Sequence, residues 1–373
     1  MSKKIFILGG YGNAGILIAK LLLENTSENI VLAGRNRQKA EAASESLNSE
    51  YQGNRVSAVK VDAANEVELT KALEDSKFLI VASSSLEFSK QVINSAITAE
   101  IDYLDIQLSS LPKLDLLNSN EKRIKDKGLC FITDGGFHPG IPAAMVRYAA
   151  TEFEEIISAN VYSYLNLDWK SYSFSSSTAL EMISEFSDYN SEFYSGGKWE
   201  KPKWSEYKKF DFGNLIGKQY TAPMMLEEMR ILPEEFSSLN ETGFFVGGFN
   251  WFINYISIPL IIPALKISKR TFIKPASKLF EFGLNNFSKP PFICILILEA
   301  RVKKNGKDIN FRMEISHPDG YLLTAVPVVS CLLQYFDGSI RKPGLHFQAS
   351  LVEPKRFFND VKSMGINLTV KHS

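Results

Sequence analysis

The first residues whose spacing suits chemistry are glycines near the start of the chain. Gly10, Gly12 and Gly15 follow the apolar run 5–8 and precede an apolar stretch long enough for a helix. In a dinucleotide-binding turn, these glycines give a tight exit from the strand, a close backbone approach to the pyrophosphate, and close helix–sheet packing. The helix N-terminus then offers free N–H groups to the phosphates. A plain strand–turn–helix is the alternative. The predicted cofactor-binding loop comprises Gly10, Tyr11, Gly12, Asn13, Ala14 and Gly15.

The end of the second apolar run, residues 30–33, distinguishes between the two nicotinamide cofactors. An NAD site places a carboxylate about 20 residues beyond the glycines to bind the ribose 2′-OH. This chain has Arg35 and Asn36 there, and its next carboxylate is Glu41. A guanidinium pairs with a 2′-phosphate, which a carboxylate would repel. The sequence therefore predicts NADP. The alternative is that Arg35 and the cations that follow it lie on the surface of the next helix.

Other polar residues follow the third and fourth predicted strands. Asp62 comes after residues 56–61 and is expected near the adenine, although it can equally form a turn or cap a helix. Ser83 and Ser84 follow residues 78–82, where the chain must pass close to the cofactor. They can equally cap the helix expected over residues 87–98.

The catalytic candidates follow the fifth and sixth predicted strands. Asp105 and Gln107 come at the end of the strand that begins at Tyr103, and His138 lies in the glycine- and proline-rich stretch 134–140. A histidine there can donate to a substrate carboxylate or transfer a proton near neutral pH. A hydrogen-bonded structural histidine is the alternative. No metal site is expected.

The order of the predicted elements indicates an α/β fold. Six short strands alternate with helices, which predicts a doubly wound parallel Rossmann sheet. From about residue 156 the pattern changes to long strands, with a hairpin over 292–302 and 309–316 turning at Asn305-Gly306. A second α+β substrate domain is therefore expected. The predicted boundaries are a dinucleotide-binding domain over 1–137, a substrate and dimerisation domain over 138–320, and a segment 321–373 returning to the Rossmann domain.

Composition excludes some classes of function. The 42 Lys and Arg balance the 42 Asp and Glu, so no field attracts nucleic acid. Cys130, Cys294 and Cys331 lie in apolar runs without close pairing. Buried free thiols in a reducing compartment are expected, which predicts a cytoplasmic protein.

Residues 249–267 are apolar except for Asn250, Asn254, Ser257 and Lys266. Pro259, Pro263 and the polar residues argue against a spanning helix. A buried domain helix is expected, and peripheral membrane contact or dimer formation are the alternatives.

The chain resembles the saccharopine dehydrogenase-like oxidoreductases, in their uncharacterised branch. The resemblance rests on residues 9–15 (Gly-Gly-Tyr-Gly-Asn-Ala-Gly), 33–35 (Ala-Gly-Arg), 103–105 (Tyr-Leu-Asp) and 136–140 (Gly-Phe-His-Pro-Gly). It implies a Rossmann domain, a substrate domain, a homodimer and hydride transfer between nicotinamide and an imine.

Three functional hypotheses follow. The first is an NADP-dependent oxidoreductase acting on a C–N bond of an amino-acid-like small molecule, with Asp105, Gln107 and His138 as its polar groups. An enoyl reductase acting on the C=C bond of an acyl or lipid-like substrate is the second. The third is a non-catalytic NADPH-binding sensor or membrane-surface adaptor.

Overall fold

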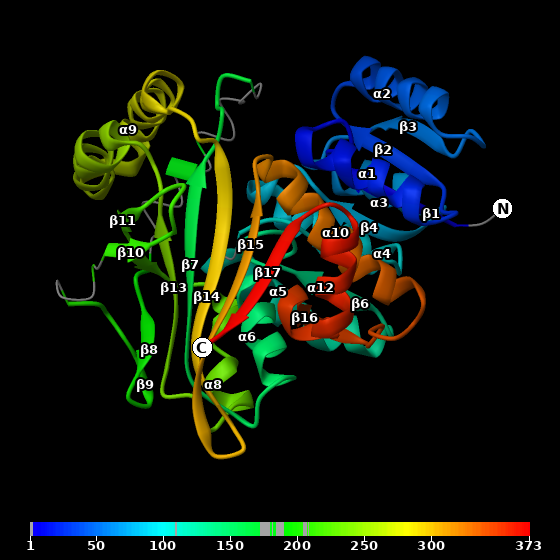
Figure 1. Cartoon of the computed structure of the whole chain (residues 1–373). Helices are drawn as coiled ribbons and strands as arrows, with labels where there is room; N and C mark the ends of the chain where they lie inside the picture. Colours follow the sequence, from blue (N-terminus) through cyan, green and yellow to red (C-terminus); the bar gives the residue numbers. More distant parts are fainter. Residues whose placement is uncertain are drawn as a thin grey trace. The chain divides into compact units, whose positions relative to one another are not determined.

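The computed structural model describes residues 3–108, 110–171, 180, 182–183, 190–203, 207 and 209–373. They form two compact units (Figure 1), one of Met1–Ala144 with Tyr321–Gly365 and the other of Met145–Gly320 with Ile366–Ser373. The chain first passes from one unit to the other inside helix α6 (Pro142–Ala150), later than the expected boundary at residue 137. The sequence also predicts a helix over residues 178–186, of which the structure describes 180, 182 and 183.

The first unit contains the predicted doubly wound sheet. Its strands run in the order β16-β6-β5-β4-β1-β2-β3 in the described part of the chain, and every pair is parallel. The order reverses between β1 and β4, the position at which such sheets bind dinucleotides. Six of the strands were predicted, and β16 was not. The strands are β1 (Lys4–Leu8), β2 (Ile30–Gly34), β3 (Val56–Lys60), β4 (Ser76–Val81), β5 (Asp102–Asp105), β6 (Cys130–Thr133) and β16 (Gly344–Phe347).

Helices cover this sheet and begin at residues that cap them. Asn36, Asn65 and Ser110 each accept a backbone N–H three residues on, at the starts of α2, α3 and α5. Phe6, Leu79 and Phe131 are among the fully buried core residues of the sheet. The helices are α1 (Asn13–Asn25), α2 (Arg37–Glu50), α3 (Glu66–Leu73), η1 (Leu86–Phe88), α4 (Ser89–Thr98), α5 (Leu111–Asp126), α10 (Gly320–Phe336), α11 (Gln348–Leu351) and α12 (Pro354–Ser363).

At the N-terminal end of β5, a buried carboxylate joins the sheet to α10. Asp102 is 3% exposed and accepts hydrogen bonds from the hydroxyl of Tyr335, from Cys130 N at 2.7 Å and from Arg341 Nε at 2.9 Å. Its charge is therefore balanced by one guanidinium. This contact, between residues 233 positions apart in sequence, explains why α10 packs against the first sheet.

The second unit is built on a mixed sheet, ordered β17-β15-β14-β7-β13-β8-β9 with β12 also paired to β13. Its β7–β13 pair is parallel and the others are antiparallel. Asn305 and Gly306 have φ of +53° and +72°, so the predicted hairpin turn is confirmed. The strands are β7 (Glu155–Asn166), β8 (Phe193–Ser195), β9 (Lys198–Glu200), β12 (Ala222–Met224), β13 (Glu241–Gly247), β14 (Ile293–Lys304), β15 (Lys307–His317) and β17 (Asn367–His372). Smaller elements are the pair β10 (Lys209–Asp211) and β11 (Lys218–Tyr220), the turn η3 (Glu227–Met229) and α8 (Leu232–Glu235).

The end of the chain corrects one prediction. Residues Tyr321–Gly365 belong to the first unit, but the closing residues Ile366–Ser373 belong to the second. Strand β17 pairs antiparallel with β15, from Ser316 with Asn367 to Phe311 with His372. The backbone groups of β15 thereby gain a partner on the side away from β14, which explains why the tail leaves the first sheet.

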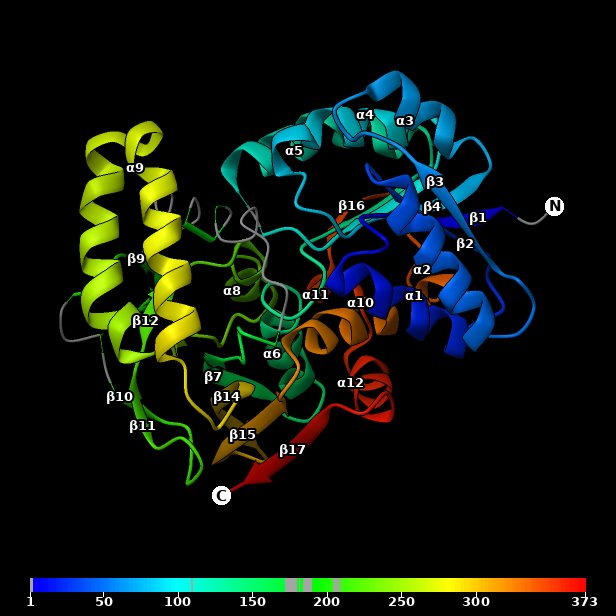
Figure 2. The ribbon, with the colours of Figure 1, turned by 90° about the horizontal axis from the view of Figure 1, so that it is seen from above.

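The apolar stretch 249–267 is helical, but the helix is only partly buried, whereas a buried helix was expected. It enters η4 (Ile253–Ser257) and then α9 (Ile258–Phe287), whose helical path breaks at Ser268. Figure 2 shows α9 as two arms lying side by side. Ile253 and Ile261 are buried, whereas Trp251 and Ile267 are exposed. No helix in the described residues is long and apolar enough to cross a membrane.

The three cysteines match their prediction, since Cys130, Cys294 and Cys331 are free and buried. Burial raises the pKa of Cys130 to about 11. These thiols are therefore protonated and unreactive near neutral pH.

Candidate active site

The glycine loop between β1 and α1 has no room for side chains at two of its predicted positions. A Cβ on Gly15 would lie 2.3 Å from the carbonyl oxygen of Gly9, and one on Gly10 would lie 2.9 Å from Leu32 Cδ2. The left-handed backbone is at Gly9, with φ of +83°. The tight exit from the strand therefore belongs to Gly9 rather than Gly10, which is needed for space.

The N-terminus of α1 has backbone donors for a phosphate. Gly12 caps the helix without a side-chain hydrogen bond, and the first helical bond runs from Ile16 N to the oxygen of Gly12 at 2.9 Å. The amides of Asn13, Ala14 and Gly15 precede that bond and have no acceptor within the helix. They can bind a pyrophosphate as predicted, with the positive end of the helix dipole behind them.

Tyr11 connects the glycine loop to the end of β2. Its hydroxyl accepts the backbone N–H of Asn36 at 2.9 Å, and a Cβ on Gly34 would lie 2.6 Å from that hydroxyl. The Asn36 side chain is used to cap α2. Tyr11 and Asn36 therefore hold the loop and the β2 end in register.

Arg35 is exposed and has no salt bridge to a residue that the structure describes. Arg37, by contrast, binds Glu41 at 2.7 Å. Of these two arginines beside the ribose end of the predicted cofactor site, Arg35 is the one left to pair with a 2′-phosphate.

The remaining cofactor candidates make local contacts. Asp62 accepts the N–H of Ala64 at 3.0 Å, the turn-forming role given as its alternative. Ser83 lies 2.9 Å from Ser85 between their hydroxyl oxygens, and Ser84 is exposed. Ser85 precedes η1 without capping it through its side chain. These serines lie at the carboxyl end of β4, as predicted.

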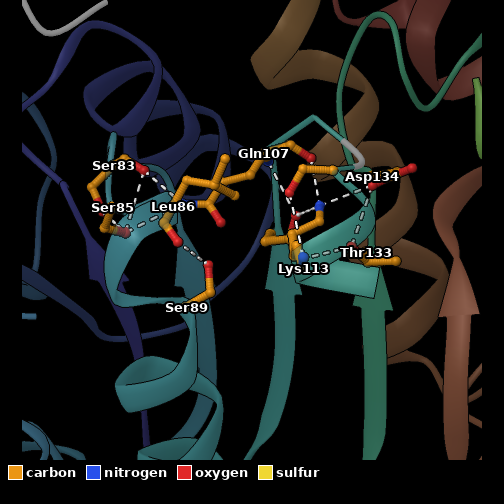
Figure 3. A network of polar contacts seen from close by, with 10 residues as sticks. Ser83, Ser85, Leu86, Ser89, Gln107, Lys113, Thr133 and Asp134 are labelled. Atoms are coloured by element: carbon orange, nitrogen blue, oxygen red, sulfur yellow. Dashed lines mark hydrogen bonds and ion pairs between the residues drawn. The ribbon is translucent and has the colours of Figure 1, made fainter. Parts of the chain in front are cut away.

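A buried lysine lies at the centre of the polar network in Figure 3. Lys113, in the first turn of α5, donates to Asp105 Oδ1 at 2.9 Å, to Asp134 Oδ1 at 2.9 Å and to the carbonyl oxygen of Gln107 at 2.7 Å. Its side chain is 1% exposed, and those of the two aspartates are 0% exposed. Three acceptors match the three donors of an ammonium group.

This Lys113 cluster, made of Lys113, Asp105 and Asp134, carries two carboxylates against one ammonium. Burial alone would lower the pKa of Lys113, but the two carboxylates outweigh it and hold that pKa above its ordinary value. The lysine therefore stays charged. Thr133 Oγ1 donates to Asp105 Oδ2 at 2.8 Å, and the backbone N–H of Gln107 donates to Asp105 Oδ1 at 3.1 Å. The cluster thus gathers two carboxylates around one ammonium at the carboxyl ends of β5 and β6.

Two features indicate that this cluster has a role besides packing. Burying charged groups costs free energy of desolvation. Asp134 also has φ of +56°, a left-handed conformation that is strained for a residue other than glycine and is concentrated at functional sites. Gln107, which is half-buried, is held by the same cluster and by its Nε2 donation to the carbonyl oxygen of Ser83 at 3.1 Å.

His138 lies in the loop that follows β6. Burial lowers the pKa of His138 to about 4, so its ring is neutral at neutral pH. The loop is fixed by the buried Gln348, whose Oε1 accepts Gly136 N at 3.3 Å and whose Nε2 donates to the oxygen of Gly140 at 3.3 Å. A neutral histidine can donate or accept one proton but does not supply a positive charge.

The structure thus brings Asp105 and Gln107 together and adds residues that sequence reasoning missed. Lys113 and Gln348 gave no signal, because a lysine in a polar helix and a glutamine after a short strand are ordinary surface residues. Thr133 gave a weak one, since it lies at a strand end where ligands bind, whereas Asp134 begins the stretch 134–140 that the sequence already indicated. Ser110-Leu-Pro before Lys113 predicts a helix start but not the burial of its lysine.

Comparison with known proteins supports this assignment of the cofactor. Residues 5–128 match the family described as the saccharopine dehydrogenase NADP binding domain. The predicted cofactor, NADP, is thereby confirmed. A search of curated proteins gives no match.

Solved structures show the fold. Apo saccharopine dehydrogenase (L-Glu forming) from Saccharomyces cerevisiae superposes with a TM-score of 0.72 over 100% of both chains, at 15% identity. Biliverdin reductase from Synechocystis, solved with biliverdin and NADP+, gives a TM-score of 0.40 at 12% identity over 97% of this chain and 96% of its own. The first likeness confirms the predicted two-domain architecture, and the second is too distant to support an argument. The chain therefore combines an NADP-binding domain of an oxidoreductase family with that family's overall fold.

Proposed function

We propose that this chain, a member of the saccharopine dehydrogenase-like family, is an NADP-dependent oxidoreductase that interconverts an imine and an amine of an amino-acid-like substrate. When bound, the nicotinamide supplies or accepts the hydride. The chain's own residues must bind the nucleotide, orient it and stabilise charge at the reacting bond.

The binding part of this proposal rests on the first sheet. The amides of Asn13, Ala14 and Gly15 are placed for the pyrophosphate, and Arg35 for the 2′-phosphate. Because the pyrophosphate lies at the switch point after β1 and the adenosine ribose at β2, the nicotinamide half must extend toward β4, β5 and β6. Asp105, Gln107 and Asp134 follow the last two of these strands.

The observation that carries the proposal is the pair of buried carboxylates, Asp105 and Asp134, in the Lys113 cluster. A protonated imine is a cation, and nearby carboxylates stabilise a cation in a site of low dielectric. Hydride addition to an enoyl group produces an enolate anion, which the same carboxylates disfavour. The charge of the cluster therefore favours C–N chemistry over the enoyl alternative.

The chemical balance of the step is simple. Hydride adds to the carbon of the protonated imine, the C=N π electrons pass to nitrogen, and the product is a neutral amine that takes a proton from water. In the other direction the amine loses hydride and becomes the iminium cation. Asp105 and Lys113 are too buried to touch the substrate, so we assign them as positioning residues for Gln107. His138, neutral at this pH, serves as a donor to the substrate.

The test is a reductive screen with purified full-length protein. NADPH is mixed with pairs of 2-oxo acids and amino acids, which form imines in solution, and in parallel with enoyl thioesters. We expect NADPH oxidation with an imine pair and a secondary amine detected by mass spectrometry. Turnover of an enoyl thioester alone would overturn the proposal, and binding of NADPH with no turnover in either set would favour the sensor hypothesis.

Two further predictions belong to this proposal. We propose a cytoplasmic location, since the three buried free thiols suit a reducing compartment. The homodimer implied by the family resemblance is proposed likewise, and sedimentation analysis of the purified chain tests it.

A further inference from the structure

The two arms of α9, with the residues next to them, form a hairpin over residues 249–289, which we call the α9 hairpin. Its first arm is apolar on two opposite faces. The inner face of this arm buries Ile253, Ile261 and Leu265, and Ile253 packs on Gly283 of the second arm. Its outer face is exposed and has large apolar residues spaced four, five and seven positions apart. Trp251 is 53%, Tyr255 66%, Leu260 59% and Ile267 79% exposed. Pro259 and Pro263, which lie between these residues in sequence, are exposed as well.

Such a helix is unusual on a surface exposed to water. A helix that is apolar all round is found buried in a protein core or in a lipid environment, and exposed apolar patches mark interaction sites. The outer stripe also includes a tryptophan and a tyrosine, the side chains that concentrate where an apolar phase meets water. The stripe therefore needs a covering partner.

The hairpin also concentrates positive charge. Residues 249–289 contain six lysines and arginines and one glutamate, in a chain whose formal net charge is zero. Arg270, Lys274 and Lys278 recur every four residues along the second arm and are exposed. Local cationic excess in a neutral chain selects a partner with negative charge.

The two arms form one rigid element. Figure 2 shows them side by side, and a Cβ on Gly283 would lie 2.5 Å from Ile253 Cδ1, so the arms cross closely there. The rings of Phe252 and Phe287 stack with centroids 4.4 Å apart, and Trp251 packs on Phe287 at 5.2 Å. The apolar stripe and the cations therefore belong to one closely packed hairpin.

We propose that the α9 hairpin docks this protein onto the surface of an anionic lipid membrane. The outer apolar stripe inserts among the headgroups and upper acyl chains, and the cations of the second arm pair with lipid phosphates, as in interfacial amphipathic helices. The contact is peripheral, since none of the helices that the structure describes can span a bilayer.

A second copy of this chain is a poorer occupant. In a two-fold symmetric dimer the same patch faces itself, so the cationic arms of both copies would lie across one interface without compensating acids in the hairpin. Anionic lipid supplies the missing charge and an apolar phase at the same time.

The experiment is flotation of the purified full chain with lipid vesicles. Vesicles of phosphatidylcholine alone are compared with vesicles that also contain phosphatidylserine, at low and high salt. We expect binding to the anionic vesicles that weakens with salt, because surface charge is screened. Arg270→Gln together with Lys274→Gln should weaken it about 30-fold, on the basis of the contribution of each cation near such a surface.

Matched controls separate this face from general stickiness. Leu260→Glu and Ile267→Glu change residues that are 59% and 79% exposed, and Leu215→Glu and Val67→Glu change residues outside the hairpin that are 60% and 81% exposed. We expect the first pair to abolish vesicle binding and the second pair to leave it intact, with all four variants folded by circular dichroism.

Three results would overturn the proposal. The first is absence of binding to phosphatidylserine vesicles, and the second is equal loss of binding in all four variants. The third is a concentration-dependent dimer in sedimentation that Leu260→Glu dissociates, which would assign the stripe to a second copy. Each result is independent of cofactor binding and of turnover.

Discussion

Strand β5 carries a buried aspartate at each end, and the two differ in charge balance. At its start, the carboxylate of Asp102 meets one guanidinium, from Arg341, and the hydroxyl of Tyr335. At its end, Asp105 shares Lys113 with Asp134, so that two carboxylates meet one ammonium. The end with one carboxylate to one guanidinium, the balanced end, faces away from the cofactor edge of the sheet, and the end with two carboxylates forms part of that edge. The paired carboxylates are therefore the ones placed to act on a ligand.

The largest effect should come from removing the lysine. Lys113→Met leaves two carboxylates buried side by side, and breaking a buried ion pair in this way costs about 3–5 kcal/mol. Urea unfolding near neutral pH should show this loss. A loss under 1 kcal/mol would mean that the pair is not buried as described.

A smaller effect is expected at the balanced end. Tyr335→Phe removes a hydrogen bond to a charged group and should cost about 1.5–3 kcal/mol of unfolding free energy. NADPH affinity, measured by calorimetry on the folded variant, should not change. A fall in NADPH affinity would show that the two ends of β5 are not separate in function.

The cofactor edge itself is tested by its exposed arginine. Arg35→Ala should weaken NADPH binding about tenfold or more, from the loss of a charge-assisted bond, and leave NADH binding and stability unchanged. Arg37→Ala is the matched control, because Arg37 already pairs with Glu41. Equal losses in both variants would remove the special role of Arg35.

The smallest effect concerns pH. The folded-state pKa of His138 is lowered from 6.5 to about 4, so between these values the unfolded chain binds more protons and stability falls as pH falls. His138→Gln should reduce the slope of unfolding free energy against pH in that range by about 1.4 kcal/mol per pH unit. Parallel curves for the two proteins would contradict this.

Local patterns in the sequence predicted the cofactor half of the fold. The strands before and after the glycine loop are short apolar runs, and the glycines are fixed by contacts within a few residues, such as Gly15 against Gly9. Strand β16 was missed because its four residues, 344–347, have no apolar run and become a strand by pairing with β6. Its formation depends on a partner that local periodicity does not reveal.

The Lys113 cluster and the α9 stripe were beyond reach for a different reason. Both depend on which side of an element is buried, and that depends on contacts distant in sequence. Lys113 lies in a polar helix, yet its side chain is enclosed by the ends of β5 and β6. Residues 249–267 are apolar at all but a few positions, so the sequence indicated burial and did not show that one face stays exposed.

The measurement that tests the central claim most directly is the affinity of the protein for NADP+ against NADPH. Asp134→Asn removes one negative charge from the Lys113 cluster and leaves Asp105 as the carboxylate partner of Lys113. If that charge stabilises a cation at the reacting end of the cofactor, the ratio of NADP+ to NADPH affinity should fall at least about threefold in Asp134→Asn. It should stay unchanged in Tyr335→Phe. An unchanged or increased ratio in Asp134→Asn, with both nucleotides still bound, would contradict the account.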